Sequence, residues 1–424
     1  MCQKCPFFKA FRAAKGGLIF MKKKMVSLGL AAMMAMSLTA CGGSGAEPAE
    51  DAEAKTEAAA GEEAKEGAAS EGGVFKIGGI GPITGAAAAY GEAVRNGIEL
   101  AVNEINEAGG VNGAMLELNF QDDENDPEKA INAYNTLKDW EMQMLVGTVT
   151  SKPCIAVAAE TAADNLFQIT PSGSAVESIS GDNAFRICFS DPDQGRASAQ
   201  YIGEHQLATK IAIIYDSSSE YSDGIRESFV AEAANQNLEI VTTEAFTADT
   251  NTDFSVQLDK AKESGAELVF LPIYYQEAST ILKQASDKGF ETTFFGCDGM
   301  DGILSVQGFD GALAEGLMFL TPFSVDEESS QEFVTKYRDA YGIDPLQFSA
   351  DAYDAVYAIK TAAEKAGVTP DMGVSDLCDA MKAAMTEITV DGLTGSGMSW
   401  TPEGEPNKEP KAVKIENGAY VMMK

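Results

Sequence analysis

The stretch Lys210-Ile211-Ala212-Ile213-Ile214-Tyr215 decides the fold class. Its four central residues are all apolar with no polar residue between them, which indicates a strand buried on both faces. The run Leu268-Val269-Phe270-Leu271 has the same character. Parallel sheets bury both faces beneath helices, so these runs predict an α/β protein built on parallel strands.

Apolar runs alternate with amphipathic stretches from Val74 onward. Strands are expected at residues 75–80, 116–121, 144–146, 167–170, 210–215, 238–245, 268–273 and 293–296. Helices are expected at residues 94–105, from 126 onward, and at 155–163, 194–204, 224–235, 254–264, 278–288, 327–341 and 348–366. This alternation predicts βαβ units. Near the end of the chain, Asn417-Gly418 between two apolar runs predicts a hairpin.

The alternation falls into two blocks, separated by the turn-rich segment 189–193. We therefore expect two doubly wound parallel-sheet lobes joined by a three-stranded hinge. The expected first lobe comprises residues 74–190 and 322–397, and the second comprises residues 191–321 and 398–424. The chain then crosses between the lobes three times, near Asp191, Thr321 and Met398.

The N-terminal segment has the pattern of a secretory signal over residues 1–41. Three lysines at 22–24 precede an apolar run over residues 25–38, which is shorter than the ~20 residues of a membrane span. The run ends in Leu38-Thr39-Ala40-Cys41, which resembles the lipobox of bacterial lipoproteins and implies lipidation of Cys41. A buried apolar helix with a chance cysteine is the alternative. Met21 is a plausible start, which would make residues 1–20 a misassigned extension.

Residues 42–73 consist mainly of Ala, Glu, Gly and Ser and contain no large apolar side chain. Such a segment cannot bury enough surface to offset the entropy of ordering, so we expect a disordered acidic linker. A solvated helix rich in Ala and Glu is the alternative. The remaining residues, 74–424, are long enough for two domains.

Charge and composition exclude several classes of function. The formal net charge is −34, and no Lys/Arg cluster follows residue 24, which argues against nucleic-acid binding. His205 is the only histidine and has no Ser or Cys partner at a readable spacing. The cysteines lack metal-site spacing, and Cys154, Cys188, Cys297 and Cys378 allow one disulfide or none. We expect no enzyme activity, no cofactor and no metal site.

Several short motifs, in order, resemble those of one known family. They are the opening 77–85, Tyr90-Gly91, 108–113, Gln121-Asp122-Asp123, Ile169-Thr170-Pro171-Ser172-Gly173-Ser174 and Asp193-Gln194-Gly195. Together they resemble the type I periplasmic binding proteins, in the leucine/isoleucine/valine-binding branch. The resemblance covers nearly all of residues 74–424. It implies a ligand site in the cleft between the two lobes.

The resemblance implies that the first lobe binds the α-carboxylate of an amino acid. Thr150-Ser151 lies between a strand and a helix, whose N-terminus presents free N–H groups. Ser172-Gly173-Ser174 follows the next strand, and Ser172 and Ser174 would complete the carboxylate site. Two alternatives stay open: Ser151 caps the helix, and 172–174 is an ordinary turn.

The second lobe would supply the groups for the amino end. Asp298 matches the acid that pairs with the ligand's α-ammonium, although the family often has Glu there and Asp-Gly is also a common turn. Tyr90, Tyr221 and Tyr274 match aromatic positions that line the family's cleft, with Tyr275 as a rival to Tyr274.

The implied function is capture of an amino acid, best guessed as Leu, Ile or Val, and its delivery to the permease and ATPase of an ABC importer. The protein would be an extracytoplasmic monomer, anchored to the cell membrane through Cys41. Two departures from the family leave the ligand open: Lys152 puts a cation at the rim, and Asn125 replaces a cysteine that bridges to the Thr150 position in some relatives. An aromatic amino acid, a short amide or an organic acid is the alternative ligand, and a ligand sensor is the alternative role.

Overall fold

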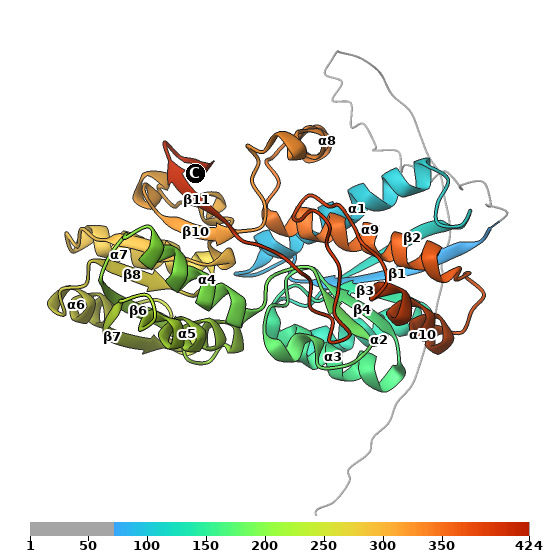
Figure 1. The fold of residues 1–424 in the computed structure, drawn as a ribbon, viewed down its shortest axis with the longest axis horizontal. Helices are drawn as coiled ribbons and strands as arrows, with labels where there is room; N and C mark the ends of the chain where they lie inside the picture. The colour runs from blue at the N-terminus through green and yellow to red at the C-terminus, as the bar shows by residue number, and fades with distance from the viewer. Residues whose placement is uncertain (1–71, 424) are drawn as a thin grey trace, which may run out of the picture. The chain divides into compact units, whose positions relative to one another are not determined.

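The computed structural model describes residues 72–423, and these form two separate β-sheets with helices on their faces (Figure 1). The expected leader at 1–41, the lipidation of Cys41 and the linker up to residue 71 lie outside the described residues. Gly73 already takes part in the fold, because its carbonyl accepts a hydrogen bond from the backbone N–H of Met115 at 3.0 Å. The expected linker therefore ends before residue 73.

The first sheet has five parallel strands in the order β2-β1-β3-β4-β5. They are β1 (Val74–Gly81), β2 (Met115–Asp122), β3 (Met144–Gly147), β4 (Phe167–Thr170) and β5 (Ala184–Arg186). One face packs on α1 (Ala88–Glu107), α9 (Gln347–Ala366) and α10 (Val374–Met385), and the other on α2 (Pro127–Asp139) and α3 (Ser151–Asp164).

Strand β1 shows why helices cover both faces of this sheet. Phe75 and Ile77 pack in the cluster that holds α1 and α9, whereas Ile80 packs in the cluster that holds α2 and α3. Successive side chains of a strand point to opposite faces, so an apolar run must bury both. Helix α2 begins where the sequence indicates, because the Asp126 carboxylate accepts hydrogen bonds from two first-turn N–H groups, each at 2.9 Å.

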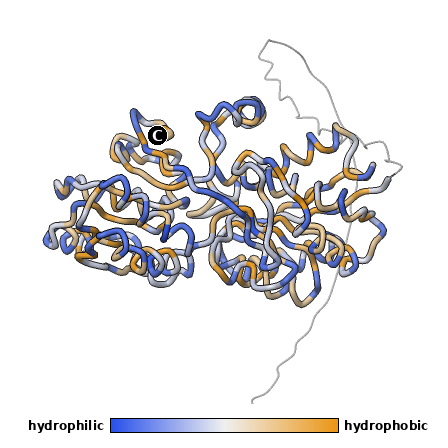
Figure 2. Tube along the Cα trace, in the orientation of Figure 1, coloured by the Kyte–Doolittle hydropathy of each residue, from blue (hydrophilic) through white to orange (hydrophobic). Residues whose placement is uncertain are grey.

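The second sheet has the order β12-β11-β10-β9-β8-β6-β7. Its strands are β6 (Lys210–Asp216), β7 (Glu239–Phe246), β8 (Leu268–Leu271), β9 (Thr293–Gly296), β10 (Met318–Thr321), β11 (Lys411–Glu416) and β12 (Ala419–Met422). Helices α4 (Asp191–Glu204) and α5 (Glu220–Ala233) cover one face, and α6 (Ser255–Glu263) and α7 (Tyr275–Asp287) cover the other. In Figure 2 the hydrophobic colour gathers along the strands.

The predicted fold class, two doubly wound parallel sheets, is confirmed, with one antiparallel edge in the second sheet. That edge is the predicted hairpin β11–β12, which turns at Asn417 and Gly418 with φ of 53° and 75°. Among the strands and α-helices of residues 72–423, β5, β10 and α10 were missed. The first two have three and four residues, too short for a clear periodicity. Helix α8 (Gln331–Tyr341) starts four residues later than expected, after a short 3₁₀ turn.

The described contacts place the last crossing between the sheets later than the sequence suggests. The Trp400 indole N–H donates to the carbonyl of Arg186 at 2.8 Å, and the Arg186 N–H donates to the carbonyl of Gly404 at 3.1 Å. Lys408 Nζ donates to the carbonyl of Ile187 at 2.9 Å. We therefore propose lobes with the expected boundaries at 190/191 and 321/322, but with the third crossing after Lys408 instead of near Met398.

Candidate functional site

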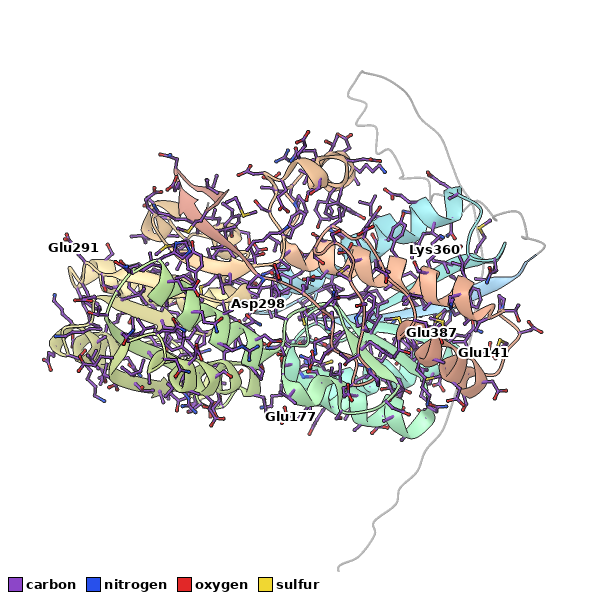
Figure 3. All side chains as sticks on the ribbon, in the orientation of Figure 1. Glu141, Glu177, Glu291, Asp298, Lys360 and Glu387 are labelled. Atoms are coloured by element: carbon purple, nitrogen blue, oxygen red, sulfur yellow. The ribbon has the colours of Figure 1, made fainter. Side chains whose placement is uncertain are left out.

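A small cavity lies between the two sheets, beyond the carboxyl ends of parallel strands from both, where α/β proteins commonly bind ligands. Its lining residues are Tyr90, Val149, Thr150, Ser172, Tyr221, Tyr274, Asp298, Gly299 and Phe348. Figure 3 labels Asp298 where the two halves meet, with Glu141 and Glu291 at the far ends. The cavity volume is about 10 Å³, the room of roughly one water molecule. An amino acid can enter only if the lobes move apart or the lining side chains turn.

Four aromatic rings form the wall of this cavity. The ring of Tyr90 lies edge-on to Tyr274 at 5.5 Å between centroids and 4.5 Å from Phe348. Tyr221 stacks on Tyr274 at 4.8 Å. Such a wall offers apolar area together with hydroxyl groups. Phe348 was missed in the sequence, where it reads as an ordinary core position of a helix.

Asp298 is the acid of the site. Its carboxylate accepts a hydrogen bond from the Tyr221 hydroxyl at 2.6 Å, and its backbone N–H donates to Gln194 Oε1 at 3.2 Å. The side chain of Gln347 reaches its carbonyl oxygen at 2.7 Å. Burial raises the pKa of Asp298 to about 6, and the hydrogen bond from Tyr221 opposes that rise. A buried acid of this kind is ready to pair with a cationic group.

Hydrogen bonds within the first lobe already occupy several of its predicted donors. The Thr150 hydroxyl donates to Asn125 Oδ1 at 2.7 Å, and the Ser172 hydroxyl donates to the carbonyl of Val149 at 2.6 Å. Thr150 and Ser172 both line the cavity, but their hydroxyl groups donate hydrogen bonds to other protein atoms and not into the cavity. The Thr150–Asn125 bond joins the two positions at which some relatives have a bridge.

Ser151 and Ser174 do not line the cavity in this closed arrangement. Ser151 is the first residue of α3 and does not cap it, so that alternative is wrong: the cap position is Thr150, and it makes no side-chain capping bond. The Ser151 hydroxyl instead accepts from the backbone N–H of Ala175 at 3.1 Å and retains its own proton for donation. Ser174 is 1% exposed, and its side chain interacts with the carboxyl group of Asp191.

Tyr90 joins the two lobes. Its hydroxyl donates to the carbonyl of Gly299 at 2.6 Å and accepts from the backbone N–H of Tyr275 at 3.2 Å. The Tyr275 hydroxyl in turn accepts from the N–H of Ala89 at 3.3 Å. Of the two rivals, Tyr274 therefore faces the cavity and Tyr275 contacts the opposite lobe.

Six of the eight predicted ligand residues thus line one cavity: Tyr90, Thr150, Ser172, Tyr221, Tyr274 and Asp298. The remaining two, Ser151 and Ser174, lie behind it. Lys152 is exposed and is not among the lining residues. Gln194 and Gln347, which hold the Asp298 backbone, were not predicted as site residues, although Gln194 belongs to the Asp193-Gln194-Gly195 motif.

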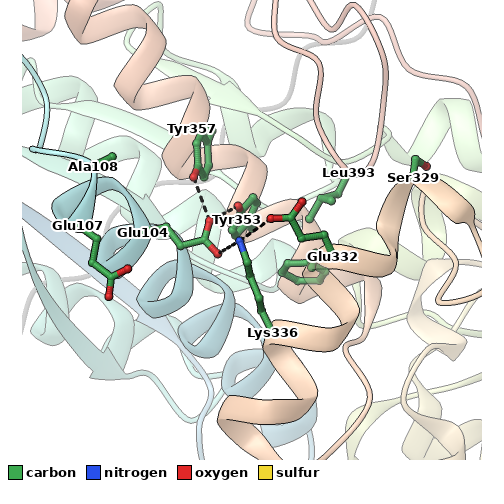
Figure 4. Close-up of a pocket in the computed structure, with 10 residues that line it drawn as sticks. Glu104, Glu107, Ala108, Ser329, Glu332, Lys336, Tyr353, Tyr357 and Leu393 are labelled. Carbon is green, nitrogen blue, oxygen red and sulfur yellow. Dashed lines mark hydrogen bonds and ion pairs between the residues drawn. The ribbon is translucent and has the colours of Figure 1, made fainter.

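A larger hollow of about 620 Å³ lies elsewhere, between α1, α8 and α9 (Figure 4). Five of its polar side chains, from Lys336, Glu104, Glu332, Tyr353 and Tyr357, are paired with one another. Lys336 Nζ contacts Glu104 at 3.0 Å and Glu332 at 2.9 Å, and the hydroxyls of Tyr353 and Tyr357 donate to Glu104. Because these groups satisfy each other and the hollow is open, it does not have the character of a buried ligand site.

Within residues 72–423, no helix combines the length and apolar character needed to cross a bilayer. No group of three or more His, Cys, Asp or Glu side chains in that part of the chain could hold a metal ion. His205 is exposed at the end of α4, with its ring 4.1 Å from that of Tyr201. The four described cysteines are free and buried.

Comparisons with known proteins agree on one family. A family model described as periplasmic binding protein matches residues 74–419. "Leu/Ile/Val-binding protein homolog 1" of Brucella suis is 30% identical over 78% of this chain and 88% of its own length. The "Leucine-, isoleucine-, valine-, threonine-, and alanine-binding protein" of Pseudomonas aeruginosa is 30% identical over 66% of this chain and 75% of its own length.

Solved structures agree. LivJ of Streptococcus pneumoniae, a branched-chain amino acid transporter substrate binding protein in complex with isoleucine, has a TM-score of 0.74 and 29% identity over 82% of this chain and all of its own. A leucine binding protein, LivK, of Thermotoga maritima has a TM-score of 0.74 and 25% identity over 82% of this chain and 98% of its own. These names describe binding proteins and transporter components, and none names an enzyme. The chain belongs to the periplasmic binding protein family, in the branch of the branched-chain amino acid-binding proteins of ABC transporters.

Proposed function

We propose that this protein captures an amino acid, of the Leu/Ile/Val type, between its two lobes and delivers it to the permease and ATPase of an ABC importer. The observation that carries the proposal is the pairing of a buried acid, Asp298, with an aromatic wall and hydroxyl groups from the opposite lobe around one cavity. A zwitterion needs an acceptor for its ammonium group and donors for its carboxylate, because either end buried unpaired costs several kcal/mol.

The donors for the carboxylate come from the first lobe. The Ser151 hydroxyl still has a proton to donate, and no side chain caps the first turn of α3. A helix N-terminus favours an anion through its free N–H groups and its dipole. Separation of the lobes would release the ring wall, and closure on the ligand would restore it.

The choice of a branched-chain ligand rests on the relatives and on the apolar wall. The fold alone does not fix it, since a solute binding protein of R. palustris in complex with benzoate has a TM-score of 0.73 at 20% identity. An aromatic amino acid, a short amide or an organic acid is the second candidate, and a sensor role is compatible with the same site. The extracytoplasmic position, the lipid anchor at Cys41 and a monomeric state belong to the same proposal.

The test is a thermal-shift screen of the twenty amino acids and several short amides and acids, followed by calorimetry on the hits. Asp298→Asn should weaken binding of the best amino acid by about 100-fold, or about 2.8 kcal/mol, since it strands a buried ammonium. Asp287→Asn, an exposed aspartate of the same lobe, is the matched control. Near-normal affinity of Asp298→Asn, or no amino acid that binds, would refute the proposed site. A Cys41→Ser chain released from the membrane fraction would support the anchor.

A further inference from the structure

Gln347 is the first residue of α9, a helix that packs on the first sheet, yet its polar groups contact elements of the second sheet. Its backbone N–H donates to Asp301 Oδ2 at 2.7 Å, and its Nε2 donates to the carbonyl of Asp298 at 2.7 Å. Its Oε1 accepts from the hydroxyl of Thr321 at 3.2 Å. Gln347 is 1% exposed, so these bonds are shielded from water. The proposed function gives them no role.

Gln331 is also the first residue of a helix, α8, and the contacts of its side chain are local. Its Nε2 donates to the carbonyls of Val325 and Glu327 at 2.7 and 2.9 Å, a few residues upstream in the chain. The two donors of Gln347 instead reach acceptors that lie 46 and 49 positions away in the chain. The contacts of Gln331 fix the start of its own helix, whereas those of Gln347 join that helix to the other sheet.

Asp301 is a buried carboxylate that caps α9 from outside the helix. The cap position of α9, Leu346, makes no side-chain capping bond, and the first N–H groups of a helix have no acceptor within it. Asp301 supplies an acceptor for the N–H of Gln347 and places a negative charge at the positive end of the helix dipole. Burial raises the pKa of Asp301 to about 7, and the hydrogen bond from the Gln347 N–H opposes that rise. A group of the second lobe thus completes a helix of the first.

The turn at 298–302, which carries the acid of the site, is packed against both lobes. A Cβ atom at Gly302 would lie 3.4 Å from Leu346 Cδ1, before α9, and 3.7 Å from the Cβ of Ala89 in α1. The backbone N–H of Gly302 donates to the hydroxyl of Tyr420 in the second sheet at 3.1 Å. The position of this turn therefore depends on how α1 and α9 lie against the second lobe.

Two glutamines hold the backbone of Asp298, and only one of them belongs to its own lobe. Gln194 in α4 accepts from the Asp298 N–H at 3.2 Å, and Gln347 in α9 donates to the Asp298 carbonyl at 2.7 Å. With lobe boundaries at 190/191 and 321/322, α4 moves together with Asp298, whereas α9 belongs to the opposite lobe. Separation of the lobes would then keep the bond to Gln194 and break the bond to Gln347. The next residue, Phe348, lines the cavity, so these contacts are continuous with the candidate site.

We propose that Gln347 and Asp301 are positioning residues, which hold Asp298 in its ligand-binding position only when the two lobes are together and so slow the release of a bound amino acid. The inference rests on the proposed function and adds to it the residues that couple lobe closure to the acid of the site. A ligand first meets the open site, in which these bonds are not made. They therefore leave the association rate unchanged and lower the dissociation rate.

The test measures the rate constants for L-leucine, L-isoleucine, L-valine and L-phenylalanine by stopped-flow protein fluorescence at pH 7.5. Gln347→Met removes both side-chain hydrogen bonds at similar volume, and it should raise the dissociation rate constant about 10-fold and change the association rate constant by under about threefold. In an Asp298→Asn chain the same substitution should change the affinity by under about threefold, because Gln347 acts through Asp298. Gln331→Met, at the start of α8, is the matched control and should change neither rate constant.

Hydrogen exchange of the wild-type chain is a second test, and it decides alone if Gln347→Met does not fold. The N–H of Gln347 is bonded to Asp301, so its exchange reports whether that contact opens. A saturating amino acid should slow this exchange by at least about 10-fold and leave that of the Gln331 N–H unchanged.

The outcomes separate this inference from the proposed function. Wild-type rate constants in Gln347→Met, or exchange at Gln347 that the amino acid does not slow, overturn the inference alone if Asp298→Asn still loses binding. An undiminished effect of Gln347→Met in the Asp298→Asn chain does the same. A wild-type chain that binds none of the four amino acids overturns both.

Discussion

Replacement of Lys408 by methionine should destabilise the fold far more than replacement of its neighbour Lys411. Lys408 Nζ lies 2.7 Å from Asp351 Oδ1, and the two side chains are 1% and 2% exposed. The same ammonium donates to the carbonyl of Ile187 at 2.9 Å and to the Thr394 hydroxyl oxygen at 2.7 Å. All three of its protons are therefore used, and together they hold the segment after residue 398 against the first lobe.

The magnitude follows from this burial. Loss of one partner from a buried ion pair costs about 3–5 kcal/mol, because the other charge stays buried and unpaired. Lys411 pairs with Glu327 at 2.5 Å, but their side chains are 30% and 25% exposed, and solvent screening reduces such a pair to about 0–1 kcal/mol. We expect a loss of about 4 kcal/mol for Lys408→Met and under about 1 kcal/mol for Lys411→Met. Asp351→Leu combined with Lys408→Met should recover most of the loss.

The cost of Lys408→Met should also depend on pH. Burial raises the pKa of Asp351 to about 6, and Lys408 opposes that rise, so without Lys408 the pKa is higher still. Between the variant's pKa and 6, a falling pH protonates Asp351 in the variant but not in the wild type. The stability difference should therefore shrink as pH falls from 8 to 6, by at most about 1.4 kcal/mol per pH unit, and level off below 6.

Urea unfolding followed by circular dichroism measures both effects. A lower midpoint at an unchanged slope reports stability. The reasoning is refuted if Lys408→Met loses no more stability at pH 7.5 than Lys411→Met. It is also refuted if the stability difference between Lys408→Met and the wild type is the same at pH 8 and pH 6.

Three further outcomes follow from the structure. Affinity for an amino acid should fall about tenfold per pH unit below 6, where Asp298 becomes protonated and no longer pairs with the ammonium group; calorimetry at pH 7.5 and 5 checks this, and a flat profile contradicts it. Gly97→Ala should cost about 1–3 kcal/mol in urea unfolding, since its Cβ would lie 2.2 Å from the carbonyl oxygen of Ser349 in the helix packed against it. Tyr90→Phe removes the hydrogen bond to Gly299 and should shift the lobes toward an open arrangement, seen as a larger radius of gyration in X-ray scattering.

Much of the fold could be predicted because its strands are buried on both faces. Strands β4 and β9 have the expected bounds, and Asp126 and Asn417-Gly418 act as the sequence indicates. The elements that were missed owe their structure to tertiary contacts. Strand β5 has three residues, and one of them, Arg186, is a fully buried cation whose partners lie in the loop at 173–176 and at Glu405.

The site residues were predicted from the resemblance to the family, and Thr150, Ser172, Tyr274 and Asp298 each follow a strand. The sequence did not predict which of these side chains have free donors in the cavity, because the hydroxyls of Thr150 and Ser172 donate hydrogen bonds to groups distant in the sequence.

The hydrogen bonds around Tyr90 have a consequence for the rate at which an importer could take up the ligand. Around Tyr90, three hydrogen bonds between protein groups join the lobes: Tyr90 to Gly299, Tyr275 to Tyr90, and Ala89 to Tyr275. At about 0.5–1.5 kcal/mol each, the three bonds stabilise the closed arrangement of the lobes by about 1.5–4.5 kcal/mol. If the importer recognises the closed form, each closed binding protein without a ligand occupies the docking site of the importer. It then competes there with ligand-bound molecules. The rate of uptake is then highest when these bonds are strong enough to retain a bound ligand but too weak to hold the two lobes closed without one.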